Sequence, residues 1–186
     1  IIFSKGGFVS LPVAVAARCL GIPVVLHESD LTPGLANRLA LPFATHICVT
    51  FPETMDHVPK AKASITGNPI RRSLLDGDAA KARKLWGFDR GKPVILVIGG
   101  SLGAARINQT IRECLPQLLA RYQVAHICGK GNTLPELTAQ GYYQFEYVDQ
   151  ELPHLFAAAD LVISRAGANA LFELLALKKP HLLIPL

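Results

Sequence analysis

The sequence has 186 residues, of which 50% are hydrophobic and 18% are charged, and its formal net charge at pH 7 is +5. High hydrophobicity with low charge excludes a disordered or collagen-like chain, and no apolar run approaches the roughly 20 residues that a membrane-spanning helix requires. The mildly basic composition favours acidic ligands, which include phosphates, anionic lipids and nucleic acids, without choosing among them.

Short β-branched runs alternate with longer helical segments along the chain. The runs are apolar throughout, and this pattern is typical of strands buried on both faces of a parallel sheet. The expected strands are residues 1–4, 23–27, 46–50, 64–66, 94–98, 124–128, 144–147, 161–164 and 182–184. The expected helices are residues 11–20, 35–41, 79–86, 104–122, 152–159 and 169–177. Pro116 should kink or split the longest helix.

Strand–helix–strand repetition predicts a doubly wound α/β sheet. A polar, turn-rich segment after Gly67-Asn68-Pro69 divides the pattern into two series. We therefore expect two Rossmann-like domains, at residues 1–68 and 79–186, joined by a linker at 69–78. Because the sequence opens and stops within strand-like runs, we expect both domains to be incomplete, as in an internal fragment of a longer protein.

Four widely spaced cysteines lack the spacing of zinc ligands. We interpret all four as reduced thiols in the core, which favours a cytosolic compartment; they are Cys19, Cys48, Cys114 and Cys128. Asp76-Gly77-Asp78 resembles a metal-chelating D-x-D, but it precedes an expected helix, so a turn with a helix N-cap is the better interpretation. We expect no metal site.

The basic residues of the segment 79–86 are interpreted as a solvated helix face; they are Lys81, Arg83 and Lys84. The sequence has no basic stripe studded with aromatic residues, so we expect no nucleic-acid partner.

Glycine-containing turns follow three of the expected strands and lead into helices. Backbone N–H groups in such a turn, together with the positive end of the following helix, form a site for anions. Gly6 and Gly7 belong to the first turn, and Gly100, Ser101 and Gly103 to the second. Each turn is also compatible with a purely structural role, in which Ser101 caps a helix. The second turn matches neither the P-loop nor the dinucleotide fingerprint.

Polar residues also follow the second expected strand. His27, Glu28 and Asp30 stand at its carboxyl end, with Asn37 shortly after. Ligands of open α/β sheets bind at this edge, so these residues are candidates for positioning or deprotonating a hydroxyl group. The alternative is a loop that satisfies its own backbone groups, with Asp30 or Thr32 capping the next helix.

Glu173 lies about two turns into an expected helix that is otherwise apolar and looks buried. A charge in such a place needs a partner. A ribose diol is one candidate partner, and a salt bridge, for example to Arg165, is the other.

Five motifs occur in one order along the chain: GGFVS, HESDLTPGLAN, GNPIR, GGSLGA and SRAGANALFE. Together they resemble the MurG family of bacterial glycosyltransferases, within glycosyltransferase family 28, over essentially the whole sequence. The resemblance implies the GT-B fold, in which two Rossmann-like domains flank the active site. It also implies transfer of N-acetylglucosamine, with inversion, from UDP-N-acetylglucosamine to the C4 hydroxyl of the muramyl sugar of lipid I, which makes lipid II for peptidoglycan.

Further expectations follow from the same resemblance. The partners would be UDP-N-acetylglucosamine, undecaprenyl-linked lipid I and the inner leaflet, at the cytoplasmic face of the plasma membrane. Apolar residues near Leu11-Pro12-Val13, with basic neighbours, are candidates for that membrane contact. No metal or other cofactor is expected.

The resemblance also carries roles to matching positions on the donor side. Ser101, with Gly100 and Gly103, would bind the donor diphosphate, and Glu173 would bind the uridine ribose. The backbone of Val148 would pair with uracil, and Arg71 matches an arginine near the donor site.

On the acceptor side, Gly6 and Gly7 match a loop implicated in binding the acceptor diphosphate. His27, Glu28 and Asn37 match a polar cluster at the cleft, and His27, Glu28 and Asp30 are the candidate catalytic residues. Many family members carry Asn where this chain has Asp30, and Tyr where it has Phe8.

Two alternatives stay open at this point. The chain resembles, less specifically, other UDP-sugar enzymes with the GT-B fold, such as a lipid galactosyltransferase or an epimerase. It could also bind UDP without catalysis, and we expect the isolated fragment to be inactive. An upstream glycine loop with a histidine and a downstream glutamine-containing segment in the full reading frame would favour the transfer of N-acetylglucosamine to lipid I over both alternatives.

Overall fold

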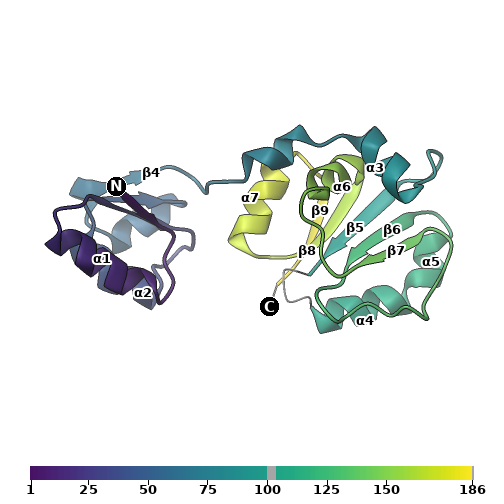
Figure 1. Ribbon diagram of the computed structural model, residues 1–186, viewed down its shortest axis with the longest axis horizontal. Coiled ribbons are helices and arrows are strands. Elements are labelled where there is room, and N and C mark those ends of the chain that lie inside the picture. The colour runs from purple at the N-terminus through teal and green to yellow at the C-terminus, as the bar shows by residue number, and fades with distance from the viewer. Residues whose placement is uncertain (100–103, 186) are drawn as a thin grey trace. The chain divides into compact units, whose positions relative to one another are not determined.

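The computed structural model describes residues 1–99 and 104–185. The chain divides into two compact units, unit 1 at Ile1–Pro69 and unit 2 at Ile70–Leu186, and Figure 1 shows the elements of each. Both are α/β units with parallel sheets.

Unit 1 contains a four-stranded sheet in the order β1-β2-β3-β4, with every neighbouring pair parallel. The strands are β1 (Ile2–Ser4), β2 (Val24–Glu28), β3 (His46–Val49) and β4 (Ala63–Ile65). The helices are α1 (Ser10–Cys19) and α2 (Leu35–Ala40), with short 3₁₀ helices η1 (Leu41–Phe43), η2 (Pro52–His57) and η3 (Lys60–Lys62). Each strand lies next to the one that precedes it in the chain, so the sheet grows in one direction only, as in one half of a Rossmann-like sheet.

The core of unit 1 lies between its sheet and α1 and α2. Apolar residues of β2 and β3 meet small residues of the helices, which let the helices approach the sheet closely; the buried set includes Ala14, Ala17, Val24, Leu26, Ala40, Ile47 and Val49. Burial on both faces was expected for every strand. In unit 1 this is wrong for β1 and β4, which each contain an exposed residue, and for β3, which alternates between buried and half-buried residues. Its second face carries polar His46, whose Nε2 lies 2.8 Å from Ser64 Oγ.

Unit 2 contains a five-stranded parallel sheet in the order β7-β6-β5-β8-β9. The strands are β5 (Val94–Ile98), β6 (Gln123–Ile127), β7 (Tyr142–Phe145), β8 (Leu161–Arg165) and β9 (His181–Ile184). The helices are η4 (Arg72–Asp76), α3 (Ala79–Trp86), α4 (Ala105–Glu113), α5 (Leu115–Leu119), α6 (Leu152–Ala158) and α7 (Ala168–Ala176). The chain winds from β5 to β7 and then returns to the other side of β5, so this sheet is doubly wound, as expected.

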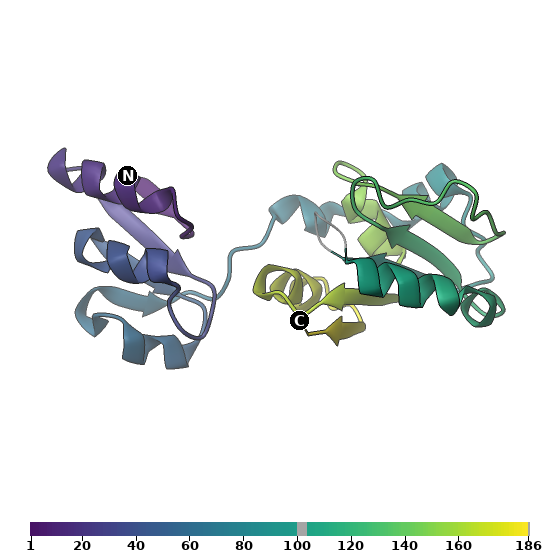
Figure 2. The same cartoon turned by 90° about the horizontal axis from the view of Figure 1, so that it is seen from below.

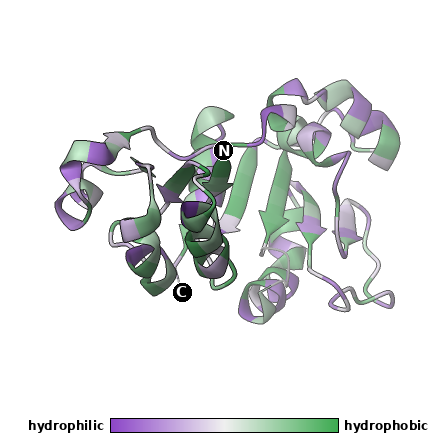
Figure 3. Ribbon diagram, turned by 60° about the vertical axis from the view of Figure 1, so that its left-hand side comes forward, coloured by the Kyte–Doolittle hydropathy of each residue, from purple (hydrophilic) through white to green (hydrophobic). Residues whose placement is uncertain are grey.

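Helices cover both faces of this sheet (Figures 1 and 2). Successive residues of β5 point to opposite faces. Val94 and Leu96 join a core with η4, α3, α6 and α7, whereas Ile95 and Val97 join a core with α4 and α5. Figure 3 shows the resulting concentration of hydrophobic residues in the strands. Burial on both faces, predicted from the continuous apolar runs, is confirmed for β5 and β6.

Two local predictions are confirmed. The long expected helix is split at Cys114, because Pro116 begins a new helix in its first turn. Asp78 is the N-cap of α3, and its Oδ1 accepts hydrogen bonds from the N–H groups of Ala80 at 2.8 Å and Lys81 at 3.2 Å. The D-x-D sequence therefore ends in a helix cap.

Residues 69–78, which were expected to form a linker, are mostly packed against unit 2. From residue 70 the segment belongs to unit 2, because Leu74 of η4 is buried in the unit 2 core. Gly77 packs so closely on α6 that a β-carbon there would overlap the Pro153 carbonyl oxygen. The hydrophobic effect fixes this segment even though its sequence is turn-like.

The cysteine prediction is correct in one part. All four cysteines are free thiols, but only Cys128 is buried. Cys19 and Cys114 are exposed, because the first ends α1 and the second lies at the junction of α4 and α5. Within residues 1–99 and 104–185, no helix is long and apolar enough to cross a membrane.

Candidate functional site

The carboxyl end of β2 in unit 1 carries the first polar cluster. Glu28 is buried, and both of its carboxylate oxygens accept hydrogen bonds. Oε1 accepts from the N–H of Asp30 at 3.0 Å, and Oε2 accepts from the N–H of Gly34 at 3.1 Å and from Asn37 Nδ2 at 2.8 Å. Glu28 therefore holds the turn between β2 and α2 in place.

His27 is also buried, and both ring nitrogens have neighbours within unit 1. Nε2 lies 2.9 Å from the carbonyl oxygen of Gly67, which can only accept, so Nε2 carries the proton. Nδ1 lies 3.4 Å from Ser29 Oγ. The histidine thus ties β2 to the chain that follows β4.

Asn37 has an unmet hydrogen-bonding group. Its Nδ2 donates to the His27 carbonyl at 3.2 Å and to Glu28, but its buried Oδ1 has no partner. The amide lies against Gly6, where a β-carbon would be 3.0 Å from both Nδ2 and Oδ1. Gly6 and Gly7 have φ values of 89° and 90°, in the region that favours glycine. A buried acceptor without a donor carries a cost, which a ligand donor would relieve.

Asp30 is the member of the predicted catalytic set whose side chain is exposed. Its backbone is fixed, since its N–H donates to Glu28 and its carbonyl accepts from Thr54 Oγ1 at 3.1 Å. The backbone geometry therefore presents the carboxylate at the surface of the turn.

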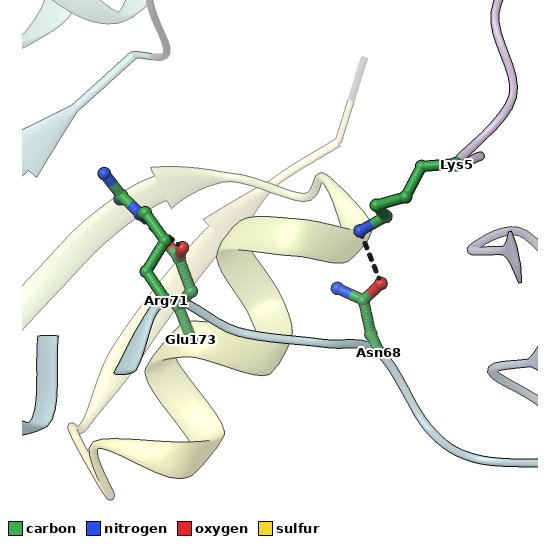
Figure 4. A network of polar contacts seen from close by, with 4 residues as sticks. All are labelled: Lys5, Asn68, Arg71 and Glu173. Atoms are coloured by element: carbon green, nitrogen blue, oxygen red, sulfur yellow. Dashed lines mark hydrogen bonds and ion pairs between the residues drawn. The ribbon is translucent and has the colours of Figure 1, made fainter. Parts of the chain in front are cut away.

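Asn68 is a participant that the sequence did not single out. Its Oδ1 accepts from Lys5 Nζ at 3.1 Å, as Figure 4 shows, and from Ser29 Oγ at 3.2 Å. The G-N-P sequence reads as a turn, and nothing in its local pattern indicates that the asparagine joins two loops 39 and 63 residues away.

In unit 2, Glu173 of α7 pairs with Arg71 (Figure 4). Arg71 Nε donates to Oε1 at 3.0 Å and Arg71 Nη2 donates to Oε2 at 3.3 Å. The expected need for a partner is confirmed, but the suggested partner Arg165 is wrong. Hydrogen bonding to Glu173 raises the pKa of Arg71 above its ordinary value. Partial burial opposes this rise, and the negative charges of Glu173 and Asp149 add to it.

The helix that carries Glu173 is less buried than its apolar sequence indicated. Leu174 is the one fully buried residue of α7, and Leu175 is 52% exposed. The helix therefore buries only a narrow stripe against the sheet. The side chain of Glu173 lies near the surface but is largely shielded from water, with 16% of it exposed.

Val148 follows β7 and packs its side chain into the unit 2 core. A cavity of about 260 Å³ lies beside it; the lining residues are Leu85, Trp86, Phe145, Tyr147, Val148, Asp149 and Glu151. The position predicted to pair with uracil therefore borders an open space, with two acidic residues and aromatic rings around it.

A second buried polar network lies beneath α4, and the sequence reasoning missed it. Asn108 Nδ2 donates to the Cys128 carbonyl at 2.8 Å, and its Oδ1 lies 2.9 Å from His126 Nε2. His126 Nδ1 lies 3.0 Å from the Tyr142 hydroxyl. Burial lowers the pKa of His126 to about 4, and nearby Arg112 contributes in the same direction. The one signal in the sequence is a histidine inside an apolar strand run.

The predicted diphosphate loop residues Gly100, Ser101 and Gly103 lie outside the described residues. Within the described ranges, no three or more His, Cys, Asp or Glu side chains form a group that could hold a metal ion.

Comparison with known proteins matches both units to one family. Residues 94–186, half of the chain, match the glycosyltransferase family 28 C-terminal domain, and residues 1–49 match the glycosyltransferase family 28 N-terminal domain. The chain belongs to glycosyltransferase family 28.

Curated relatives in this family are identical to the chain at well over half of the aligned positions. It is 60% identical to a protein of Clostridium kluyveri and 59% identical to one of Geobacillus kaustophilus, over its full length. Both are named UDP-N-acetylglucosamine–N-acetylmuramyl-(pentapeptide) pyrophosphoryl-undecaprenol N-acetylglucosamine transferase. The chain spans 53% and 52% of these two relatives, about half of their length.

Solved structures of GT-B enzymes agree with the fold. MurG of Acinetobacter baumannii aligns with a TM-score of 0.65 at 26% identity, over 99% of this chain and 52% of that one. A putative UDP-N-acetylglucosamine 2-epimerase of Listeria monocytogenes aligns with a TM-score of 0.73 at 13% identity, over 98% and 56%. The second likeness concerns the fold alone.

Proposed function

We propose that the full-length protein containing this chain transfers N-acetylglucosamine from UDP-N-acetylglucosamine to the muramyl C4 hydroxyl of lipid I. The names of the curated relatives support this choice of substrates. The observation that carries it is the ion pair of Arg71 and Glu173, which joins the motifs GNPIR and SRAGANALFE across 102 residues of sequence.

On the donor side, Glu173 offers a carboxylate to the ribose hydroxyls, and Val148 borders the space for the uracil. The reaction we propose is a single displacement. The acceptor oxygen forms a bond to the anomeric carbon as the bond to the diphosphate oxygen breaks, and the hydroxyl proton passes to a base. The glycine-rich segment before α4 would then stabilise the leaving diphosphate through backbone N–H groups, without a metal.

On the acceptor side, the hydrogen bonds of His27 and Glu28 favour a positioning role for both residues. Asp30, whose carboxylate is exposed, is then the remaining candidate base of the three. Gly6 and Gly7 would present N–H groups to the acceptor diphosphate, and the unmet Oδ1 of Asn37 would accept from a ligand hydroxyl or amide.

An undecaprenyl-linked acceptor requires that the protein works at a membrane. We propose a peripheral location at the cytoplasmic face of the bacterial plasma membrane. Exposed apolar residues of the α1 region are compatible with contact to lipid; they include Phe8, Val9 and Val13.

The donor role is tested with the full-length protein by calorimetry with UDP-N-acetylglucosamine. Glu173→Ala should weaken binding by roughly 10-fold, because a charged hydrogen bond contributes more than a neutral one. Glu136→Ala, which removes an exposed carboxylate elsewhere in unit 2, is the control and should leave binding unchanged. Equal affinity of both variants would refute the ribose role of Glu173.

The base is tested separately, with transfer kinetics on lipid I. Asp30→Asn should lower kcat by at least roughly 100-fold with the dissociation constant of the donor unchanged, as expected for a general base. An unchanged kcat removes Asp30 from the catalytic residues while leaving the donor assignment intact.

A further inference from the structure

We propose that Arg71 is a specificity-determining residue that pairs with the Glu173 carboxylate before the nucleotide binds and exchanges to the phosphate of the incoming nucleotide. This inference rests on the proposed function, because it assumes that Glu173 binds the ribose. The side chain of Arg71 would thereby couple recognition of the ribose to recognition of the phosphate.

The geometry of the pair sets up the competition. Arg71 uses two nitrogens, Nε and Nη2, against the two carboxylate oxygens, at 3.0 and 3.3 Å. This is the side-by-side arrangement in which one edge of the carboxylate is filled by two parallel donors. A ribose diol also offers two adjacent hydroxyl donors, so it needs the same edge.

The burial of the two partners shows which one can move. The Glu173 side chain is 16% exposed and that of Arg71 is 51% exposed. A carboxylate that is largely shielded from water cannot lose its donors without a large cost, whereas a half-exposed guanidinium can turn into solvent. The exchange therefore keeps Glu173 in place and replaces the donors around it.

In solvent the released guanidinium donates to water, and an anionic acceptor nearby would bind it more strongly. Arg carries five N–H donors and no acceptor, and it binds phosphate through two parallel hydrogen bonds. A nucleoside diphosphate provides such an acceptor, but a nucleoside does not. Arg71 should thus oppose the binding of a nucleoside and assist the binding of its diphosphate.

The test uses the full-length protein with Arg71→Met, which removes the donors and keeps the length of the side chain. Calorimetry with uridine and with UDP should give changes of opposite sign. Uridine should bind roughly 5-fold more tightly, and UDP roughly 5-fold more weakly, the scale of one hydrogen bond. With 2′,3′-dideoxyuridine, which lacks the diol, the variant should show no gain.

Arg90→Met is the matched control, because it removes an exposed arginine of the same unit. It should leave both affinities unchanged. Weaker binding of uridine and UDP alike in Arg71→Met would mean that Arg71 only orients Glu173, and it would overturn the exchange. An unchanged affinity for uridine would overturn it as well. If the unmodified protein binds no UDP, the proposed function fails first, and the exchange fails with it.

Discussion

The amide of Asn37 lies directly against the α-carbon of Gly6, so that a β-carbon at residue 6 would approach both Nδ2 and Oδ1 to 3.0 Å. This contact joins the loop after β1 to α2. It makes residue 6 sensitive to substitution for two reasons, a positive φ and a close neighbour, whereas residue 7 has only the first.

Gly6→Ala should therefore destabilise unit 1 more than Gly7→Ala. The positive φ should cost about 1–2 kcal/mol in each variant, and the displaced Asn37 amide should add about 1 kcal/mol in the first. Denaturant unfolding of both variants measures the difference. Equal free energies of unfolding would contradict the contact.

Glu28→Gln should lower the free energy of unfolding by about 1–3 kcal/mol, because an amide nitrogen would face one of three donors that now meet a carboxylate. Glu53→Gln, at an exposed position of the same unit, should change it by less than about 0.5 kcal/mol. Chemical denaturation provides both values. If the two variants lose the same stability, Glu28 does not hold the turn.

Gly77→Ala should destabilise unit 2 through a steric clash with α6. The φ of Gly77 is −70°, so strain is absent and the close approach to the Pro153 carbonyl and to Ala157 of α6 is the whole effect. We expect a loss of about 1–3 kcal/mol, as for an overpacked site. Gly167→Ala, at φ −89° with open space around it, is the control and should be nearly neutral. Thermal melting would show a lower midpoint for the first variant alone.

The buried His126 should make stability depend on pH. Its pKa is lowered from 6.5 to about 4, so the unfolded chain binds more protons than the folded chain between these values. Its contribution to the free energy of unfolding is therefore fully present above pH 6.5 and falls toward pH 4, by up to about 3 kcal/mol. Unfolding curves from pH 7 to pH 4 measure this slope.

Two variants separate His126 from other titrating groups. His126→Gln should lose this part of the slope, whereas Tyr142→Phe keeps the histidine buried and should retain it. The same slope in His126→Gln and the unmodified chain would contradict the assignment.

The elements were predictable because their signals are local. Pro116 splits the long helix and Asp78 caps α3, and both effects act within a few residues of sequence. The continuous apolar runs of β5 and β6 likewise report burial on both faces, which depends on the composition of the strand itself.

The contacts of the candidate site were less predictable because they join distant segments. The partner of Glu173 is Arg71, 102 residues away, although Arg165 is nearer in sequence. The sequence placed Glu28 among the catalytic candidates, but its burial and its three donors depend on how the turn to α2 closes. Charge and residue type indicate that a partner is needed, and only the fold selects which one.

The docking of η4 on α6 has a practical consequence for dissecting the molecule. A recombinant version of unit 2 should start at Ile70, since a start at Ala79 would remove Leu74 and uncover the apolar surface that this leucine shields. Proteolysis should follow the same logic, with cleavage inside residues 70–78 slower than their turn-rich composition suggests.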